Sequence, residues 1–146
     1  MKRTIIQIFL TVTFGINSQA QLKVANYACG KPRTDTYEHF AFWTKDGNRT
    51  EISYSYGKNS KNVKLRYLGN DKLNGESTFK VQFSNNYVLF ITPIGLRLKV
   101  TDSAGRYSKT FAWQYEGPVN GIGTYCDVCA DDDEDAMKLL KASYLK

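Results

Sequence analysis

Apolar and polar residues alternate along most of the middle of the chain. Between Glu38 and Glu116, about seven runs place an apolar or aromatic residue at every second position, separated by short breaks rich in Gly, Asn, Ser and Asp. In FKVQF, which begins at Phe79, the first, third and fifth residues would face one side and the two polar residues the other. Such alternation is typical of half-buried β-strands. The pattern therefore predicts about seven strands over residues 38–116, and the apolar stretch over 24–28 indicates a further one.

The links between these strands are short, so neighbouring strands should run antiparallel. Asp46-Gly47 is the clearest hairpin signal, because both residues tolerate the positive φ of a tight turn. We expect a longer loop over residues 69–77, and we expect the strand that begins near Tyr87 to end at Thr92, before Pro93. With no helix expected before residue 130, the sheet must cover its own apolar face. The prediction is a mainly β fold, an antiparallel meander forming a small barrel or sandwich.

The first 20 residues have the pattern of an export signal. Two basic residues and an apolar run from Ile5 to Ile16 precede Ser18-Gln19-Ala20, which places small residues before a cleavage point. The apolar run is shorter than the ~20 residues that span a bilayer. We expect cleavage near Ala20, followed by an exported (secreted or periplasmic) chain with no membrane span that forms one domain over 21–146.

The chain changes character after the last predicted strand. Residues 117–130, with several glycines and a C-x-x-C pair, predict a loop. Residues 131–146 predict a C-terminal helix, because acidic residues begin it and lysines end it, as the helix dipole favours. Its apolar side would be formed by residues at helical spacing, namely Val128, Met137, Leu140 and Tyr144. We expect this helix to pack on the edge of the barrel or to plug one end.

The chain has a formal net charge of +6, and basic residues alternate along several predicted strands. They would share one face of the sheet: Lys64, Arg66, Lys80, Arg97 and Lys99. Binding of single-stranded nucleic acid also needs aromatic rings exposed on that face, and the aromatic residues mostly occupy the other one. The pattern predicts a solvated outer face and no nucleic-acid partner.

Three cysteines allow several arrangements in an exported protein. A disulfide from Cys29 to Cys126 or Cys129 would staple the N-terminal part of the domain to the C-terminal part, and one of the three would be left over. A Cys126–Cys129 bond is the alternative, and a C-x-x-C pair can also carry thiol-redox chemistry. A zinc site commonly needs four Cys or His ligands at suitable spacing, so no metal is expected.

No pattern of catalytic residues stands out. His39 is the only histidine, and nothing in the sequence pairs it with a nucleophile. The glutamates Glu38, Glu51, Glu76 and Glu116 are scattered at strand ends, where solvated turn residues are expected. We therefore expect no catalytic residues, no cofactor and no enzymatic activity.

One segment resembles a known family. Asp102-Ser103-Ala104-Gly105-Arg106-Tyr107, then Phe111-Ala112-Trp113 and a later cysteine, looks like part of the C-type lysozyme inhibitors. These are small exported β-barrels with a Ser/Gly-rich loop that enters the lysozyme cleft. The resemblance covers about a quarter of the mature chain. The doubled Ser-Gly pattern is missing, and the C-terminal helix has no counterpart in that family. The resemblance implies Ser103 and Arg106 as contact residues, while an ordinary hairpin turn fits the same residues equally well.

The leading interpretation is a non-enzymatic exported binding module. It would use the mouth of the barrel or the loops over 102–106 and 117–125, because binding sites often lie on loops above a rigid scaffold. Ser103, Arg106 and Trp113 are the candidate binding residues, and the partner would be a protein or a small apolar or aromatic ligand. The alternatives are an inhibitor of a secreted hydrolase acting through the 102–106 hairpin, and a thiol-redox protein using Cys126 and Cys129.

Overall fold

The computed structural model describes residues 21–59, 61–114 and 128–145, with the backbone alone for residues 128 and 129. The expected signal peptide over 1–20, the loop over 117–125 and Cys126 lie outside the described residues. Within the described ranges, no helix is both long and apolar enough to cross a membrane.

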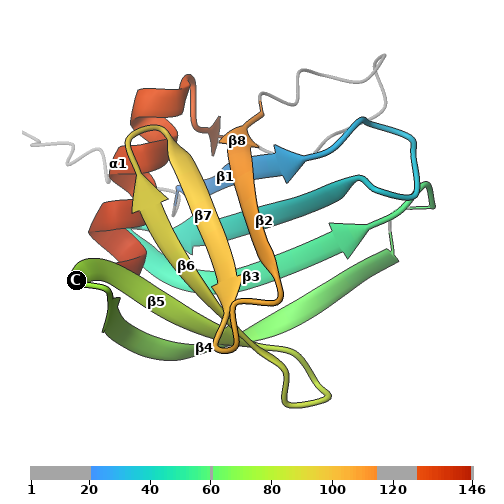
Figure 1. Cartoon of the computed structure of the whole chain (residues 1–146). Coiled ribbons are helices and arrows are strands. Elements are labelled where there is room, and N and C mark those ends of the chain that lie inside the picture. The colour runs from blue at the N-terminus through green and yellow to red at the C-terminus, as the bar shows by residue number, and fades with distance from the viewer. Residues whose placement is uncertain (1–20, 60, 115–127, 146) are drawn as a thin grey trace, which may run out of the picture.

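The described chain forms a closed β-barrel with one C-terminal helix (Figure 1). The elements are β1 (Leu22–Cys29), β2 (Glu38–Lys45), β3 (Asn48–Tyr56), β4 (Lys61–Leu73), β5 (Glu76–Gln82), β6 (Val88–Ile94), β7 (Arg97–Asp102), β8 (Ser108–Trp113), β9 (Val128–Cys129) and α1 (Asp133–Tyr144). Strands β1 to β8 follow one another around the barrel in chain order, each antiparallel to its neighbours. The ring closes where β8 pairs with the second half of β1, and the short β9 pairs in parallel with the first half.

The predicted fold class is confirmed, and the closed barrel decides between the two expected forms. The seven predicted strands correspond to β2 through β8, and the expected further strand is β1. β1 pairs with β2 along its whole length and with β8 at Tyr27↔Trp113 and Ala28↔Ala112. Closing the sheet in this way covers the two edges that a seven-stranded meander would expose.

The expectation of a loop over residues 69–77 was wrong, because β4 and β5 form a continuous hairpin there. The turn consists of Asn74 and Gly75, which have φ values of 53° and 82°. Asn-Gly is a strong signal for such a turn, because both residues tolerate positive φ. The register between β4 and β5 shifts between Tyr67 and Gly69. This bulge breaks the alternation in the sequence and conceals the continuing strand.

The expectation that the strand ends at Thr92 was also wrong, because β6 continues through Pro93 to Ile94. β5 pairs with β6 only as far as Ile91, whereas β7 pairs with it up to Ile94. Pro93 therefore lies where β6 has a neighbouring strand on one side alone, and a strand tolerates a residue without an N–H group there. At the same point the Thr78 hydroxyl donates to the Ile91 carbonyl (2.8 Å), which ties β5 to β6 where their pairing ends.

Large side chains fill the interior of the barrel. The largest fully buried ones are Tyr27, Phe40, Phe42, Phe79, Leu89, Ile91, Leu98, Phe111, Leu140 and Tyr144. Several rings meet edge to face, with centroid distances of 4.9 Å for Phe40–Phe111 and 5.8 Å for Phe42–Phe79. This geometry is favourable for aromatic pairs. The interior is therefore a packed core.

The two ends of the barrel differ. The turns after β2, β4 and β6 lie at one end together with α1, which we call the helix end (Figure 1). The loops after β1, β3, β5 and β7 lie at the opposite end, which we call the mouth.

Helix α1 plugs the helix end of the barrel, which was one of the two arrangements expected from the sequence. Its N-cap is Asp132, whose carboxylate accepts a hydrogen bond from the Asp135 backbone N–H (2.8 Å). Its buried face includes Met137, Leu140 and Tyr144, as the spacing predicted. Val128 is not part of this face, because it lies in β9 beside β1, before the cap that starts the helix.

Tyr144 connects α1 to the barrel through both its ring and its hydroxyl. The residue is only 1% exposed, and its ring packs against those of Phe42 and Phe79, with centroid distances of 5.4 Å and 5.6 Å. Its hydroxyl lies 2.8 Å from the Trp43 carbonyl oxygen and 3.0 Å from that of Glu51. These two residues pair beside a register shift between β2 and β3. Tyr144 therefore fills the core and provides a donor where the strand pairing is irregular.

Replacing Tyr144 with alanine should lower the free energy of unfolding by about 3–5 kcal/mol, because the change empties a fully buried aromatic site. Tyr144→Phe keeps the ring and should cost about 1–2 kcal/mol, because buried carbonyl oxygens lose their donor. Urea unfolding of the chain over residues 21–146 measures both changes. Tyr56→Phe, at an exposed tyrosine in β3, is the matched control and should change stability by less than about 0.5 kcal/mol. A Tyr144→Ala variant as stable as this control would contradict the structural role of α1.

Candidate functional site

Ionisable and aromatic side chains gather at the mouth of the barrel. β2 begins there with Glu38, β3 ends there with Tyr54 and Tyr56, and the 102–107 hairpin joins β7 to β8 there. Glu38 precedes Phe40 by two residues and therefore faces the barrel interior, since side chains alternate along a strand.

Glu38 is nearly buried and accepts three hydrogen bonds. Its Oε2 accepts from the hydroxyls of Tyr54 (2.9 Å) and Tyr107, and its Oε1 accepts from Lys109 Nζ. The side chain of Glu38 is 9% exposed and that of Lys109 is 39% exposed, so the ion pair reaches from the interior to solvent. This carboxylate joins β2 to β3 and to the β7–β8 side of the barrel where the barrel opens.

The surroundings keep Glu38 ionised and both tyrosines protonated. Burial opposes ionisation of Glu38, but its three hydrogen bonds and the charge of Lys109 outweigh burial and hold the pKa of the carboxyl below its ordinary value. Burial and the hydrogen bond to Glu38 raise the pKa values of Tyr54 and Tyr107. A general acid or base works best with a pKa near the operating pH. All three pKa values are moved away from neutrality.

The expectation that Glu38 is a solvated turn residue was wrong. Its even spacing from Phe40 was the signal that could have placed it on the interior face. The expectation of a solvated glutamate fits Glu51 and Glu76 better than it fits Glu38. Glu51 forms an exposed ion pair with Lys64 (2.7 Å), and Glu76 is exposed at the start of β5. Glu116 lies outside the described residues.

A second carboxylate, that of Asp102, holds the 102–107 hairpin. Asp102 Oδ1 accepts from the Arg106 backbone N–H (2.8 Å), and Oδ2 accepts from the Tyr87 hydroxyl (3.1 Å). Gly105 has a φ of 70°, which favours glycine, and its N–H donates to the Asp102 carbonyl (3.3 Å). Burial opposes ionisation of Asp102. The N–H groups of Tyr107 and Arg106 and the Tyr87 hydroxyl nevertheless hold the pKa of Asp102 below its ordinary value.

The candidate binding residues Ser103 and Arg106 lie together at the tip of this hairpin. All four residues from Ser103 to Arg106 are exposed, and the Arg106 side chain is 82% exposed. Trp113, the third candidate, ends β8 at the opposite end of that strand and packs half-buried against the core. The structure therefore brings two of the three candidates together and leaves Trp113 outside their surface.

A row of aromatic rings connects the hairpin to the other side of the mouth. The distances between ring centroids are 6.0 Å for Tyr87–Phe83, 5.3 Å for Phe83–Tyr54 and 5.9 Å for Tyr54–Tyr56. The two outer members are partly open to solvent, with Tyr56 49% and Tyr87 37% exposed. We define the mouth surface as Tyr56, Tyr87 and residues 103–106, supported by the half-buried rings of Tyr54 and Phe83.

The backbone register limits which cysteines can pair. Cys29 ends β1 at the mouth, whereas the backbone of Cys129 lies beside Val24 near the start of β1. Cys29 lies five residue steps beyond Val24 along the strand, which is about 16 Å. The Cα atoms of a disulfide are normally less than about 7 Å apart, so a Cys29–Cys129 bond does not fit this register. Cys29 is a free thiol within the described residues, and Cys126 lies outside them.

Within the described ranges, no group of three or more His, Cys, Asp or Glu side chains is arranged to hold a metal ion. No protein-family model, curated protein or solved structure matches this chain. The likeness to the lysozyme inhibitors therefore stands on one short segment. A functional interpretation has to be built on the geometry of the mouth.

Replacing Glu38 with glutamine should destabilise the protein by about 1–3 kcal/mol at pH 7, because the change removes charged hydrogen bonds from a nearly buried site. The pKa of Glu38 is lowered in the folded state, so its stabilisation is present above the unfolded pKa and is lost as the pH falls through the folded pKa. The stabilities of wild type and Glu38→Gln should therefore converge below the ordinary glutamate pKa of about 4.5.

Denaturant unfolding between pH 3 and pH 8 measures this convergence. Glu51→Gln is the matched control, because it removes an exposed ion pair and should cost less than about 1 kcal/mol at any pH. A Glu38→Gln deficit that stays constant down to pH 3 would show that the carboxylate charge contributes nothing.

Proposed function

We propose that the protein is an exported, non-enzymatic binding module that recognises a protein partner through the mouth surface. The observation that carries this proposal is the 102–107 hairpin. Its tip is fully exposed, while its base is held by the nearly buried carboxylate of Asp102. A loop fixed in this way loses little conformational freedom on binding, so more of its contact energy becomes affinity.

The composition of the mouth surface supports a protein as the partner. Tyrosine and arginine are enriched among the residues that dominate protein–protein binding energy, and the surface presents Tyr56, Tyr87 and Arg106. The core below is filled by side chains such as Phe40 and Phe111, which leaves little room there for a small ligand inside the barrel. The pKa shifts of Glu38, Tyr54 and Tyr107 away from neutrality favour a structural role for the charged cluster over acid–base catalysis.

A capture experiment tests this proposal. Mature wild type, a Ser103→Ala/Arg106→Ala double variant and a Lys99→Ala control on the outer face of β7 are immobilised and exposed to an extract of the exported compartment. We expect one protein to be captured by wild type and control about tenfold more strongly than by the double variant, since alanine at an interface hot spot costs about 1–2 kcal/mol or more. The captured protein, once purified, should show the same order of affinities in calorimetry. Equal capture by the double variant would overturn the proposal.

Inhibition of a secreted hydrolase is the second candidate, and one observation favours it. The exposed tip, residues 103–106, carries no bulky apolar group, and its base is fixed by the hydrogen bond from the Arg106 N–H to Asp102. Such a tip suits insertion into an enzyme cleft, which is what the resemblance to the lysozyme inhibitors implies.

A C-type lysozyme is the probe for this second candidate. Wild type should slow the lysis of peptidoglycan in a dose-dependent manner, and Arg106→Ala should raise the inhibitor concentration needed by about tenfold or more. The Lys99→Ala control should inhibit like wild type. Absence of inhibition at a large molar excess of wild type would remove this candidate and leave the broader binding proposal standing.

A further inference from the structure

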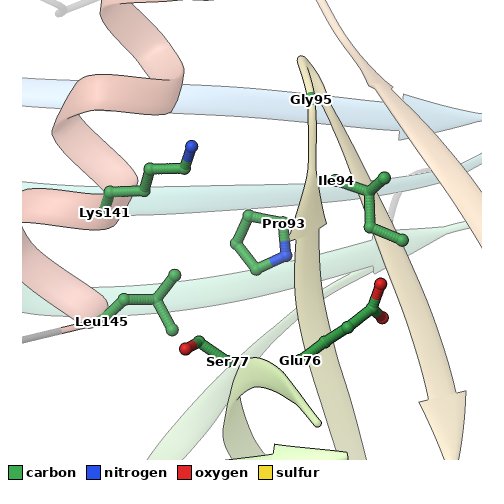
Figure 2. A pocket seen from close by; sticks show the side chains of 7 residues that line it. All are labelled: Glu76, Ser77, Pro93, Ile94, Gly95, Lys141 and Leu145. Carbon is green, nitrogen blue, oxygen red and sulfur yellow. The ribbon is translucent and has the colours of Figure 1, made fainter. Parts of the chain in front are cut away.

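A separate groove lies at the helix end of the barrel, away from the mouth. It has a volume of about 580 Å³ and is bounded by the start of β5, the end of β6 and the last turn of α1 (Figure 2). A smaller recess of about 280 Å³ adjoins it and shares Ser77 and Leu145 with it. Small-molecule sites usually measure about 300–1,000 Å³, so the groove is large enough for a ligand.

The groove follows from the way β5 and β6 separate. Their pairing ends at Phe79↔Ile91, and β6 then continues alone beside β7 through Pro93 to Ile94. Leu145, just after α1, faces Pro93 across the resulting space (Figure 2). Pro93, two residues beyond the last pair of β5 with β6, thus lies on the floor of the groove.

The walls of the groove carry opposite charges over an apolar floor. Figure 2 shows Lys141 of α1 and Glu76 of β5 on opposite sides of Pro93. Within the described residues, neither charge has an ion-pair partner, and the two do not pair with each other. Pro93 lies between the two charges, Leu145 lies on the side of Lys141, and Ile94, which is 45% exposed, lies on the side of Glu76; all five residues line the same groove. The charges and the apolar floor are therefore available to one ligand.

We propose that this groove binds a short peptide with free termini and aliphatic side chains. The ligand carboxylate would pair with Lys141 and its ammonium group with Glu76, because charge-assisted hydrogen bonds are the stronger ones. Its side chains would cover Pro93, Ile94 and Leu145, and the Ser77 hydroxyl can hydrogen-bond its peptide group. We favour a peptide over a single amino acid, because Glu76 and Lys141 lie on opposite sides of Pro93 without pairing, and a peptide separates its two charges by a chain. The groove is open, so we expect a Kd on the order of 0.1–1 mM for a dipeptide.

The experiment is an NMR titration of the full mature chain with the dipeptide Leu-Leu, following the methyl signals of Ile94 and Leu145. We expect saturable shifts in wild type and affinities lower by about five- to tenfold in both Lys141→Gln and Glu76→Gln, as expected for loss of one charged contact. Lys138→Gln is the matched control, because Lys138 lies on the same helix and pairs with Glu134 (2.9 Å) outside the groove. Lys138→Gln should bind like wild type.

Two further probes separate the peptide from other occupants. N-acetyl-Leu-Leu-amide lacks both charges and should bind at least fivefold more weakly than Leu-Leu, and octanoate carries only the negative one. If the blocked peptide binds as tightly as Leu-Leu, the proposal is overturned in favour of an apolar patch. If octanoate binds more tightly than Leu-Leu, and more tightly still to Glu76→Gln, it is overturned in favour of an anionic amphiphile. No shift at Ile94 or Leu145 up to about 10 mM Leu-Leu, well above the Kd expected for such a ligand, would also overturn it.

Arg106→Ala, which removes the protruding side chain of the mouth surface, should bind Leu-Leu like wild type. The proposal for the groove and the proposal for the mouth surface can therefore be tested independently.

Discussion

Burial of the Tyr144 ring fixes the C-terminal helix on the barrel at the end where β3 and β4 are no longer paired. β3 pairs with β4 only as far as Ile52↔Leu65, so the backbone hydrogen bonds between them stop before the helix end is reached. Tyr144 packs on rings from the barrel core, and its hydroxyl lies by the Trp43 carbonyl, 101 residues away in sequence. The ring of strands itself closes where β1 pairs with β8. Both contacts use segments near the two ends of the described chain, so the core is complete only when the first strand and the last helix are in place.

Most of the fold follows from the alternation of apolar and polar residues. The seven strands from β2 to β8 and the Asp46-Gly47 turn come directly from that pattern, and the apolar face of α1 comes from its helical spacing. The two errors, at residues 69–77 and at Pro93, have one physical origin. In both places a strand continues past a residue that breaks its local pattern. Near Gly69 the break is a bulge, and at Pro93 it is the missing N–H group. Local patterns do not show which side of a strand is paired, and this pairing decides whether such an interruption is tolerated.

The candidate site was less accessible from the sequence. Ser103 and Arg106 belong to a hairpin that the sequence marks clearly, so their position at one exposed tip was predictable. Glu38 carried a signal in its even spacing from Phe40, but its partners Tyr107 and Lys109 lie about 70 residues further along the chain. Only the closed ring of strands brings them together. The groove beside Lys141 was not predictable for the same reason, since it depends on where the pairing of β5 with β6 ends.

The charges at the two ends of the barrel differ in one physical respect. At the mouth, Glu38 and Asp102 are nearly buried, and each accepts hydrogen bonds from a tyrosine hydroxyl and from other donors of the same chain. A buried carboxylate bonded in this way fixes the segments around it and keeps little capacity to bind a ligand. At the helix end, Glu76 and Lys141 border an apolar groove without ion-pair partners among the described residues. The mouth therefore has a fixed shape, which the proposed recognition of a protein partner would use, whereas the exposed charges of the groove are open to the proposed peptide.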